Sequence, residues 1–314
     1  MPNYNGVWSL STQYQYRTGW PVPNPQDMGL FAGGSLTANI DFVSISSTGN
    51  ALSFGDLTKA RFSLVGLGSS TRAVFAGGLN GGATDIIEFV TVETSGNATD
   101  FGDLTVASYS KGGLSSNTRG LFIAGSNAAG GLLATIDYIT IGSTGNASDF
   151  GDTAAAKQKA KGFSSTTRGV YGGGTVSGTI NVIEYVTIAN TGNGSDFGDL
   201  TVARADPASF SSSTRGIFAG GDASGGGTPS NVIDYVTIAS AGNASDFGDL
   251  LAARREAAGC SSKTRGLIGG GYEGATVIQF VTIASTGDAT DFGDLTGNGI
   301  GALGGCSNVH GGLS

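Results

Sequence analysis

Acidic side chains recur along this chain at a regular spacing, and they are the strongest candidates for chemistry. One set occupies the second position of the motif Ile-(Asp/Glu)-(Tyr/Phe)-Val: Asp41, Glu88, Asp137, Glu184 and Asp234, with Gln279 in the last copy. A second set closes the motif Asp-Phe-Gly-Asp: Asp56, Asp103, Asp152, Asp199, Asp249 and Asp294. Paired carboxylates support acid and base catalysis only when different environments separate their pKa values. Because repetition gives every copy similar surroundings, we expect these acids to be structural and predict no catalytic residue.

Arginine recurs with the acids, in a Thr-Arg pair. Its members are Arg72, Arg119, Arg168, Arg215 and Arg265. An unpaired charge inside a sheet is costly. We therefore predict that the Thr-Arg arginines form ion pairs with the acids of the Ile-(Asp/Glu) motif, and that the acids also cap turn amides.

The sequence contains few residues that could bind a metal or a cofactor. The oxygen-rich stretch Thr-Gly-Asn-Ala-Ser-Asp-Phe-Gly-Asp leaves calcium as a minor alternative, but it lacks the alternating acids and distal Glu of an EF-hand loop. His310 is the only histidine, so a zinc cluster or a Ser-His-Asp arrangement is disfavoured. The Asn-x-(Ser/Thr) sequons recur with the same turn, which favours turn chemistry over glycosylation. We expect no cofactor and no metal.

The elements that must position these residues are six degenerate copies of one unit, from Met28 onward. The motif phenylalanine recurs at Phe54, Phe101, Phe150, Phe197, Phe247 and Phe292, which gives a period of 45 to 50 residues. Each copy predicts a small-residue strand, an apolar strand ending at a glycine doublet, a strand rich in β-branched and aromatic residues, and a short outer strand. Such a unit is typical of a propeller blade.

The two ends of the repeat region predict how the ring closes. The first copy lacks a small-residue inner strand, whereas residues 301–308 form an inner strand with no blade after it. Pairing the two fragments removes exposed sheet edges. We therefore predict an all-β protein: a six-bladed kelch-like β-propeller at residues 28–314, closed by a C-terminal strand, with an extended N-terminal arm at residues 1–27.

These repeats resemble kelch repeats, with a glycine doublet after the second strand and aromatics in the third and fourth. A more specific resemblance is to the glycine-rich kelch-like proteins of tailed bacteriophages, which repeat Thr-Arg-Gly-x-Phe-x-Gly-Gly and Ser-Thr-Gly-Asn-Ala-x-Asp-Phe-Gly-Asp-Leu closely. The resemblance implies a virion component, of the tail fibre or decoration type.

The N-terminal arm differs from the repeats in composition. It holds both tryptophans and four of the six prolines, and it also resembles short N-terminal segments of phage tail and fibre proteins. Rigid aromatic side chains make good interface anchors. We predict a virion-docking arm with Trp8, Leu10, Tyr14, Tyr16 and Trp20 as contacts. The alternative is an arm that folds back over the ring.

Composition narrows the partners and the compartment. The formal net charge of -8 disfavours nucleic acid or an anionic membrane surface as the main partner. No segment approaches the roughly 20 apolar residues of a membrane span, and no signal peptide is recognisable. Cys260 and Cys306 occupy the same position in successive inner strands; a disulfide is conceivable, but we expect free, partly buried thiols.

The function that these features favour is a non-enzymatic virion protein for host attachment. The connections after the glycine doublets differ most between copies, so we expect a ligand site among them, with Asn80, Asn127, Asp222 and Tyr272 as candidates. Expected partners are other virion structural proteins, a host-surface glycan or receptor, and further copies of this chain. One alternative is a capsid or tail decoration protein without a receptor role; a less favoured one is a carbohydrate-active enzyme.

Overall fold

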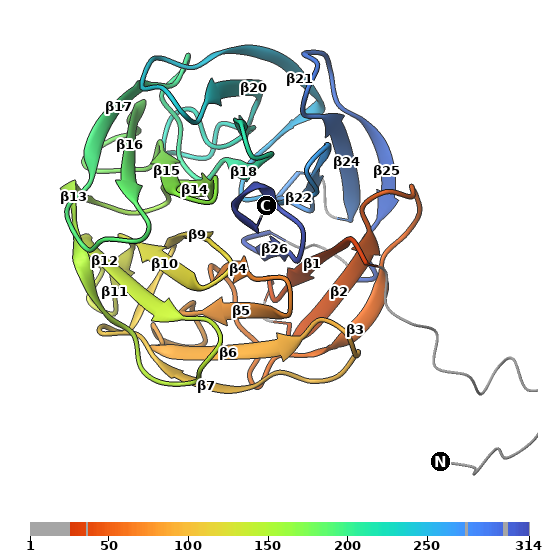
Figure 1. Ribbon diagram of the computed structural model, residues 1–314. Helices are drawn as coiled ribbons and strands as arrows, with labels where there is room; N and C mark the ends of the chain where they lie inside the picture. The colour runs from red at the N-terminus through yellow and green to blue at the C-terminus, as the bar shows by residue number, and fades with distance from the viewer. Residues whose placement is uncertain (1–25, 36, 274–275, 298–300, 314) are drawn as a thin grey trace, which may run out of the picture.

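Six four-stranded antiparallel sheets stand in a ring in the computed structural model (Figure 1). Their inner strands line a central channel. The structure describes residues 26–35, 37–273, 276–297 and 301–313. Strands are ordered from the channel outward. Blade 1 contains β26 (Gly304–Ser307), β1 (Met28–Ala32), β2 (Asn39–Ser44) and β3 (Leu52–Asp56), and blade 2 contains β4 (Val65–Gly68), β5 (Arg72–Ala76), β6 (Ile86–Thr91) and β7 (Thr99–Asp103). Blade 3 contains β9 (Gly112–Ser115), β10 (Arg119–Ile123), β12 (Leu133–Thr140) and β13 (Ser148–Lys157), and blade 4 contains β14 (Lys161–Ser164), β15 (Arg168–Gly172), β16 (Val182–Thr187) and β17 (Ser195–Asp199). Blade 5 contains β18 (Ala208–Ser211), β19 (Arg215–Ala219), β20 (Ser230–Thr237) and β21 (Ser245–Arg254), and blade 6 contains β22 (Ala258–Ser261), β23 (Arg265–Gly269), β24 (Val277–Thr282) and β25 (Thr290–Asp294).

Three short elements lie outside the blades. β8 (Ser108–Tyr109) pairs with β11 (Ser126–Asn127), and η2 (Gly311–Leu313) is one turn of 3-10 helix. No helix in the described part of the chain is long and apolar enough to cross a membrane.

Blade 1 is assembled from both ends of the repeat region. β26 pairs antiparallel with β1, from Gly29 opposite Ser307 to Ala32 opposite Gly304. This pairing gives the first blade its inner strand and leaves the ring without a gap. The predicted six-bladed propeller and its closure by a C-terminal strand are confirmed.

An aromatic pair fills the outer half of every blade. The motif phenylalanine of the outer strand meets the aromatic residue of the third strand edge-on; Phe42 and Phe54, for example, have ring centroids 6.0 Å apart and planes at 84°. The five other blades repeat this geometry. Edge-to-face aromatic pairs contribute about 0.5–1.5 kcal/mol each beyond the area they bury. The aromatic positions of the repeat are therefore explained by packing.

Neighbouring blades are tied together at the rim by the turn before each outer strand. The side-chain oxygen of its asparagine accepts a hydrogen bond from the N–H of the aspartate that closes the motif in the preceding blade, as from Asp103 to Asn146 at 3.1 Å. The same bond recurs at the five other junctions, with Asp288 replacing asparagine once. A Cβ on Gly102, whose φ is +147°, would lie 2.5 Å from the carbonyl of Gly145. The sequon asparagines therefore lie in turns, and their side chains join neighbouring blades.

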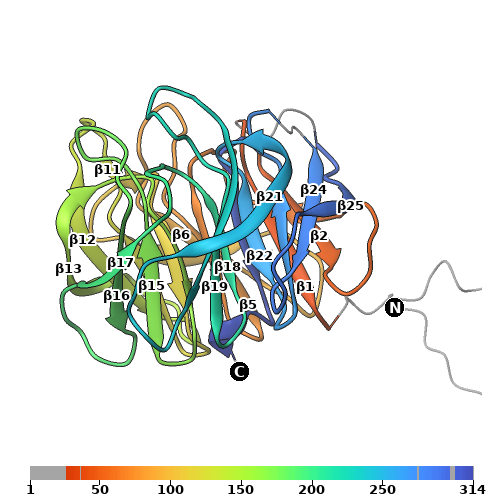
Figure 2. The ribbon, with the colours of Figure 1, turned by 90° about the horizontal axis from the view of Figure 1, so that it is seen from above.

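The two faces of the ring differ. On the plug face, where η2 lies, the first and second strands are joined by three residues, as at 69–71, and the third and fourth by seven, from 45–51 to 283–289. On the loop face, the second-to-third connections vary from 33–38 in blade 1 to 220–229 in blade 5. Figure 2 shows the loop that carries β11 and the C-terminus on opposite sides of the ring. Variation in the length of the connections is thus confined to the loop face.

Candidate functional site

The Thr-Arg arginines join neighbouring blades on the plug face. The guanidinium of Arg72 lies over the ring of Phe89, 4.4 Å from its centroid, and donates to the carbonyl of Ile141 in the next blade at 2.8 Å. Arg119, Arg168, Arg215 and Arg265 stack and donate in the same way. They form no ion pair with an acid in the described residues.

The predicted pairing of these arginines with Glu88, Asp137, Glu184, Asp234 and Asp41 is therefore wrong. The reason is the alternation of side chains along a strand. Arg72 lies opposite Thr91 and shares a sheet face with Phe89, whereas Glu88 is adjacent to Phe89 and points to the other face. The acid also lies nearer the loop face, opposite Phe75.

The strand acids instead pair with basic residues that follow or end the outer strand of the preceding blade. The pairs are Arg61 with Glu88, Lys111 with Asp137, Lys157 with Glu184, and Arg204 with Asp234. Every side chain in these pairs is at most 3% exposed. Burial lowers the pKa of Arg61, Lys111 and Arg204, while the facing carboxylate opposes that shift. Four blade junctions therefore contain a buried ion pair.

The acids also accept hydrogen bonds from the crossover, as predicted for turn amides. Glu88 accepts from the N–H of Thr58 at 2.7 Å, and Asp41 accepts from the N–H of Thr296 at 2.8 Å. In blade 6, Gln279 accepts from the N–H of Leu251 in the same way. These side-chain oxygens accept hydrogen bonds from the crossover of the preceding blade, so the acids help to hold the blade junctions together.

Sequence reasoning missed the basic partners, although the sequence contains a signal for them. In four blades a basic residue lies five residues after the last aspartate of the motif, and the first three of these residues pair with an acid: Arg61, Lys157, Arg204 and Arg254. The fourth, Arg254, faces a junction where glutamine replaces the acid. It is 3% exposed and donates to the carbonyls of Gly270 and Val277, at 3.0 and 3.1 Å.

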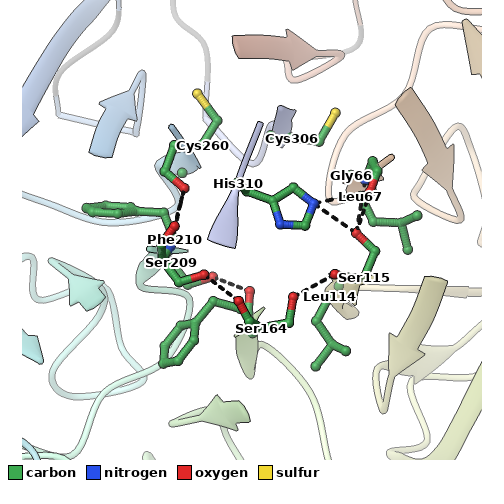
Figure 3. Close-up of a pocket in the computed structure, with 18 residues that line it drawn as sticks. Gly66, Leu67, Leu114, Ser115, Ser164, Ser209, Phe210, Cys260, Cys306 and His310 are labelled. Carbon is green, nitrogen blue, oxygen red and sulfur yellow. Dashed lines mark hydrogen bonds between the residues drawn. The ribbon is translucent and has the colours of Figure 1, made fainter. Parts of the chain in front are cut away.

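The central channel is narrow, and η2 and its flanking residues cover its plug-face end. Two cavities of about 50 Å³ each lie along it, lined by the inner strands. Serine hydroxyls circle the plug-face half, each donating to a carbonyl of the preceding blade: Ser115, Ser164, Ser211, Ser261 and Ser307. Blade 2 has Gly68 at this position, and His310 contacts its carbonyl. Figure 3 shows His310 pointing toward Ser115.

His310 does not have the arrangement of a catalytic base. Its Nδ1 accepts a hydrogen bond from the N–H of Gly312 at 3.1 Å, so the proton is on Nε2. Nε2 donates to the carbonyl of Gly68 at 3.1 Å and lies 3.2 Å from the Ser115 hydroxyl. A general base for serine would need an unprotonated Nε2. Desolvation lowers the pKa of His310 to about 4, which keeps the ring neutral.

The two cysteines are buried free thiols, as expected, though more completely buried than predicted. Burial raises the pKa of both thiols, because desolvation disfavours the charged thiolate. Figure 3 shows both sulfurs directed away from His310. A Cβ on Gly29 would lie 2.6 Å from the sulfur of Cys260, so this thiol packs between blades 6 and 1. Within the described residues, no group of three or more His, Cys, Asp or Glu is placed to hold a metal.

The channel mouth on the loop face is a ring of six residues with left-handed backbone. They lie two residues before each inner strand, with φ from 53° to 63°: Ser63, Ser110, Lys159, Asp206, Glu256 and Ala302. Backbone hydrogen bonds of 2.8–2.9 Å link most neighbours around the ring, as from the N–H of Lys159 to the carbonyl of Ser110. Non-glycine residues adopt this conformation at a cost. The mouth is thus held in one shape.

Charged residues gather on one half of this mouth. Lys159 lies 3.9 Å from Asp206 and 3.6 Å from Glu256, and Lys161 lies 2.8 Å from Asp206. Burial raises the pKa of Glu256, and the nearby Asp206 raises it further. The opposite half of the ring carries Ser63, Ser110 and Ala302.

The four candidate loop residues lie on the loop face, but they differ in availability. Asp222 is 4% exposed; burial opposes its ionisation, yet the N–H groups of its own loop outweigh burial and lower its pKa. Asn127 accepts from the N–H groups of Ala129 and Gly131. Asn80 is exposed at a loop tip, and Tyr272 is 66% exposed. Asp222 and Asn127 therefore hold their own loops, whereas the side chains of Asn80 and Tyr272 are exposed to solvent.

The predicted docking residues Trp8, Leu10, Tyr14, Tyr16 and Trp20 lie outside the described residues. Comparison of the chain with models of known protein families and with curated proteins finds no match.

Proposed function

We propose that this protein is a non-enzymatic structural component of a tailed-phage virion, which holds its ring on the particle and presents the loop face to a host-surface glycan or receptor. The resemblance of the repeats to phage kelch-like proteins supplies the setting. The observation that carries the rest is a difference between the two faces. The strand connections on the plug face have the same lengths from blade to blade, whereas those on the loop face vary in length. Variable loops on a rigid scaffold are suited to recognition.

The junctions between blades support a rigid scaffold. Each described pair of neighbours is tied at the rim by an asparagine or aspartate side chain, and four pairs are tied by a buried ion pair. A scaffold whose blades are tied in this way loses little conformational entropy on binding a ligand.

The start of the described chain supports anchoring from the plug face. The carbonyl of Gln26 accepts from the side chain of Asn308 at 3.2 Å, and the carboxylate of Asp27 accepts from Ser44 and Ser46. Asp27 also borders a hollow of about 420 Å³ on the plug face, with Lys263, Arg265 and Val309. Another virion protein held here would leave the loop face exposed.

Labelling of intact particles and a competition assay test the proposal together. An antibody against the ring should decorate purified virions, and the recombinant full chain should compete with virions for attachment to host cells. Exchanging residues 222–231 for the shorter loop at 175–181 should weaken competition while leaving incorporation intact. Removing residues 1–25 should have the opposite effect.

Other outcomes identify the alternatives. Particles that lack the protein but attach normally would indicate a capsid or tail decoration protein. Turnover of host polysaccharide by the purified chain would indicate a carbohydrate-active enzyme.

A further inference from the structure

The residue type that follows the glycine doublets differs between blades, and the fold does not require these differences. The residue after each glycine doublet, or after Ala124-Gly125 in blade 3, is Ser35, Leu79, Ser126, Thr175, Asp222 or Tyr272. In several blades its N–H donates to the crossover, as from Leu79 to Phe62 and from Tyr272 to Arg255. A backbone bond of this kind is indifferent to the side chain. Only blade 6 has an aromatic residue there.

Tyr272 is the only exposed aromatic residue in the described part of the chain. It keeps 66% of its surface exposed, whereas the tyrosines and phenylalanines of the blades are buried or half-buried. An exposed ring contributes little to the core, and aromatic rings at a surface favour binding. The position of Tyr272 therefore points to a ligand.

The ring is also held in place by its neighbours. The guanidinium of Arg255 lies over Tyr272, 4.5 Å from the ring centroid. Glu273 accepts from both the backbone N–H and the Nε of Arg255, each at 3.0 Å. The long loop of blade 5 is adjacent, since a Cβ on Gly227 would lie 3.4 Å from the guanidinium of Arg255. Tyrosine, guanidinium and carboxylate thus form one preorganised group.

The charges around this group are balanced. Lys159, Lys161 and Arg255 face Asp206, Glu256 and Glu273, with paired atoms 2.8–3.9 Å apart. A polyanion or a polycation would meet as much repulsion as attraction. A neutral ligand with one apolar face and several hydroxyls fits this surface, since the ring offers a stacking face and the carboxylates and guanidinium offer directed acceptors and donors.

We propose that Tyr272, Arg255 and Glu273 form a binding subsite for a neutral hexose of a surface glycan, extending along the charged half of the channel mouth. This subsite rests on the proposed function and names its ligand class. The exposed part of Tyr272 stacks on the C–H face of the sugar. Free acceptor positions on Glu273 receive its hydroxyl groups.

A neutral-glycan array and titration calorimetry with the matching methyl hexoside test the subsite on the full chain. Tyr272→Ala should weaken binding at least about tenfold, and Tyr272→Phe should bind within a fewfold of wild type, because the stacking face remains. Leu52→Ala is the matched control, since Leu52 is 62% exposed but lies on the outer strand of blade 1. It should bind as wild type does. Affinity should change little between low and high salt, unlike that of an acidic glycan.

The outcomes separate the subsite from the proposed function. Unchanged glycan binding by Tyr272→Ala, with wild-type melting, would overturn the subsite and leave host-surface binding intact. Attachment to host cells without affinity for any neutral glycan would also overturn it. Absence of the protein from virions, or of any effect on attachment, would overturn the proposed function itself.

Discussion

At the scale of single residues, the blade junctions show which departures from the repeat matter. Arg254 retains the position of Arg204, but its acidic partner has become Gln279. A buried cation without a directly paired carboxylate is poorly compensated, because carbonyl dipoles and the more distant Glu273 replace only part of the lost hydration. The junction between blades 5 and 6 should therefore be the weakest of the junctions that contain a buried basic side chain.

Gln279→Glu should therefore stabilise the ring. The new carboxylate can accept from Arg254 while keeping the bond from the N–H of Leu251, and we expect the free energy of unfolding to rise by ~2 kcal/mol. Chemical denaturation at neutral pH measures it. Asp234→Asn, which removes the carboxylate that faces Arg204, is the opposite control and should cost about 3 kcal/mol. Destabilisation by Gln279→Glu would show that Arg254 does not turn toward its neighbour.

His310 gives the fold a pH dependence of its own. Its pKa in the folded protein is about 4, below the value of 6.5 for a free histidine. As pH falls from 6.5 towards 4, the unfolded chain takes up a proton that the folded chain does not, so stability decreases; above 6.5 this penalty is absent, and below 4 it is constant. Wild type should lose more stability than His310→Gln across this window. If stability changed equally in the two proteins across this window, the lowered pKa of the half-buried His310 would be contradicted.

At the scale of elements, β26 and the segment that follows it, which contains η2, contribute separately to the stability of the ring. Deleting residues 301–314 leaves unpaired edges on β1, and the protein should aggregate or lose cooperative unfolding. Deleting only residues 309–314 keeps β26 and should leave unfolding cooperative, with a lower melting temperature. Size-exclusion chromatography and calorimetry distinguish the two. Cooperative, monomeric behaviour of the longer deletion would contradict closure through β26.

The strands could be predicted from the sequence because each has a local signal, whereas the pairing of charges could not. Glycine doublets, β-branched runs and the Asp-Phe-Gly-Asp motif mark strands and turns within a few residues. The partner of Glu88 depends on which sheet face a side chain occupies and on how the next blade is placed, and both emerge only in the assembled ring. The loops were predicted as a binding region, but the self-bonded state of Asp222 and Asn127 depends on loop conformation.

At the scale of the whole molecule, ring and arm should be separable. The six blades complete their strands from residues 28–307, so removing residues 1–25 should leave the melting temperature within a few degrees of wild type. Differential scanning calorimetry of the shortened chain measures this. A large loss of stability would favour the alternative that the arm folds back over the ring.

The two-ended origin of blade 1 also bears on how the protein is made. During synthesis β1 emerges early, yet its inner partner β26 emerges only after five other blades. Domains that need contacts between distant segments fold late, because the loop between those segments must close first. The open edge of β1 is therefore a hazard for as long as translation continues. A chain that ends before β26 lacks the inner strand of blade 1, so the edge of β1 stays open and the ring does not close.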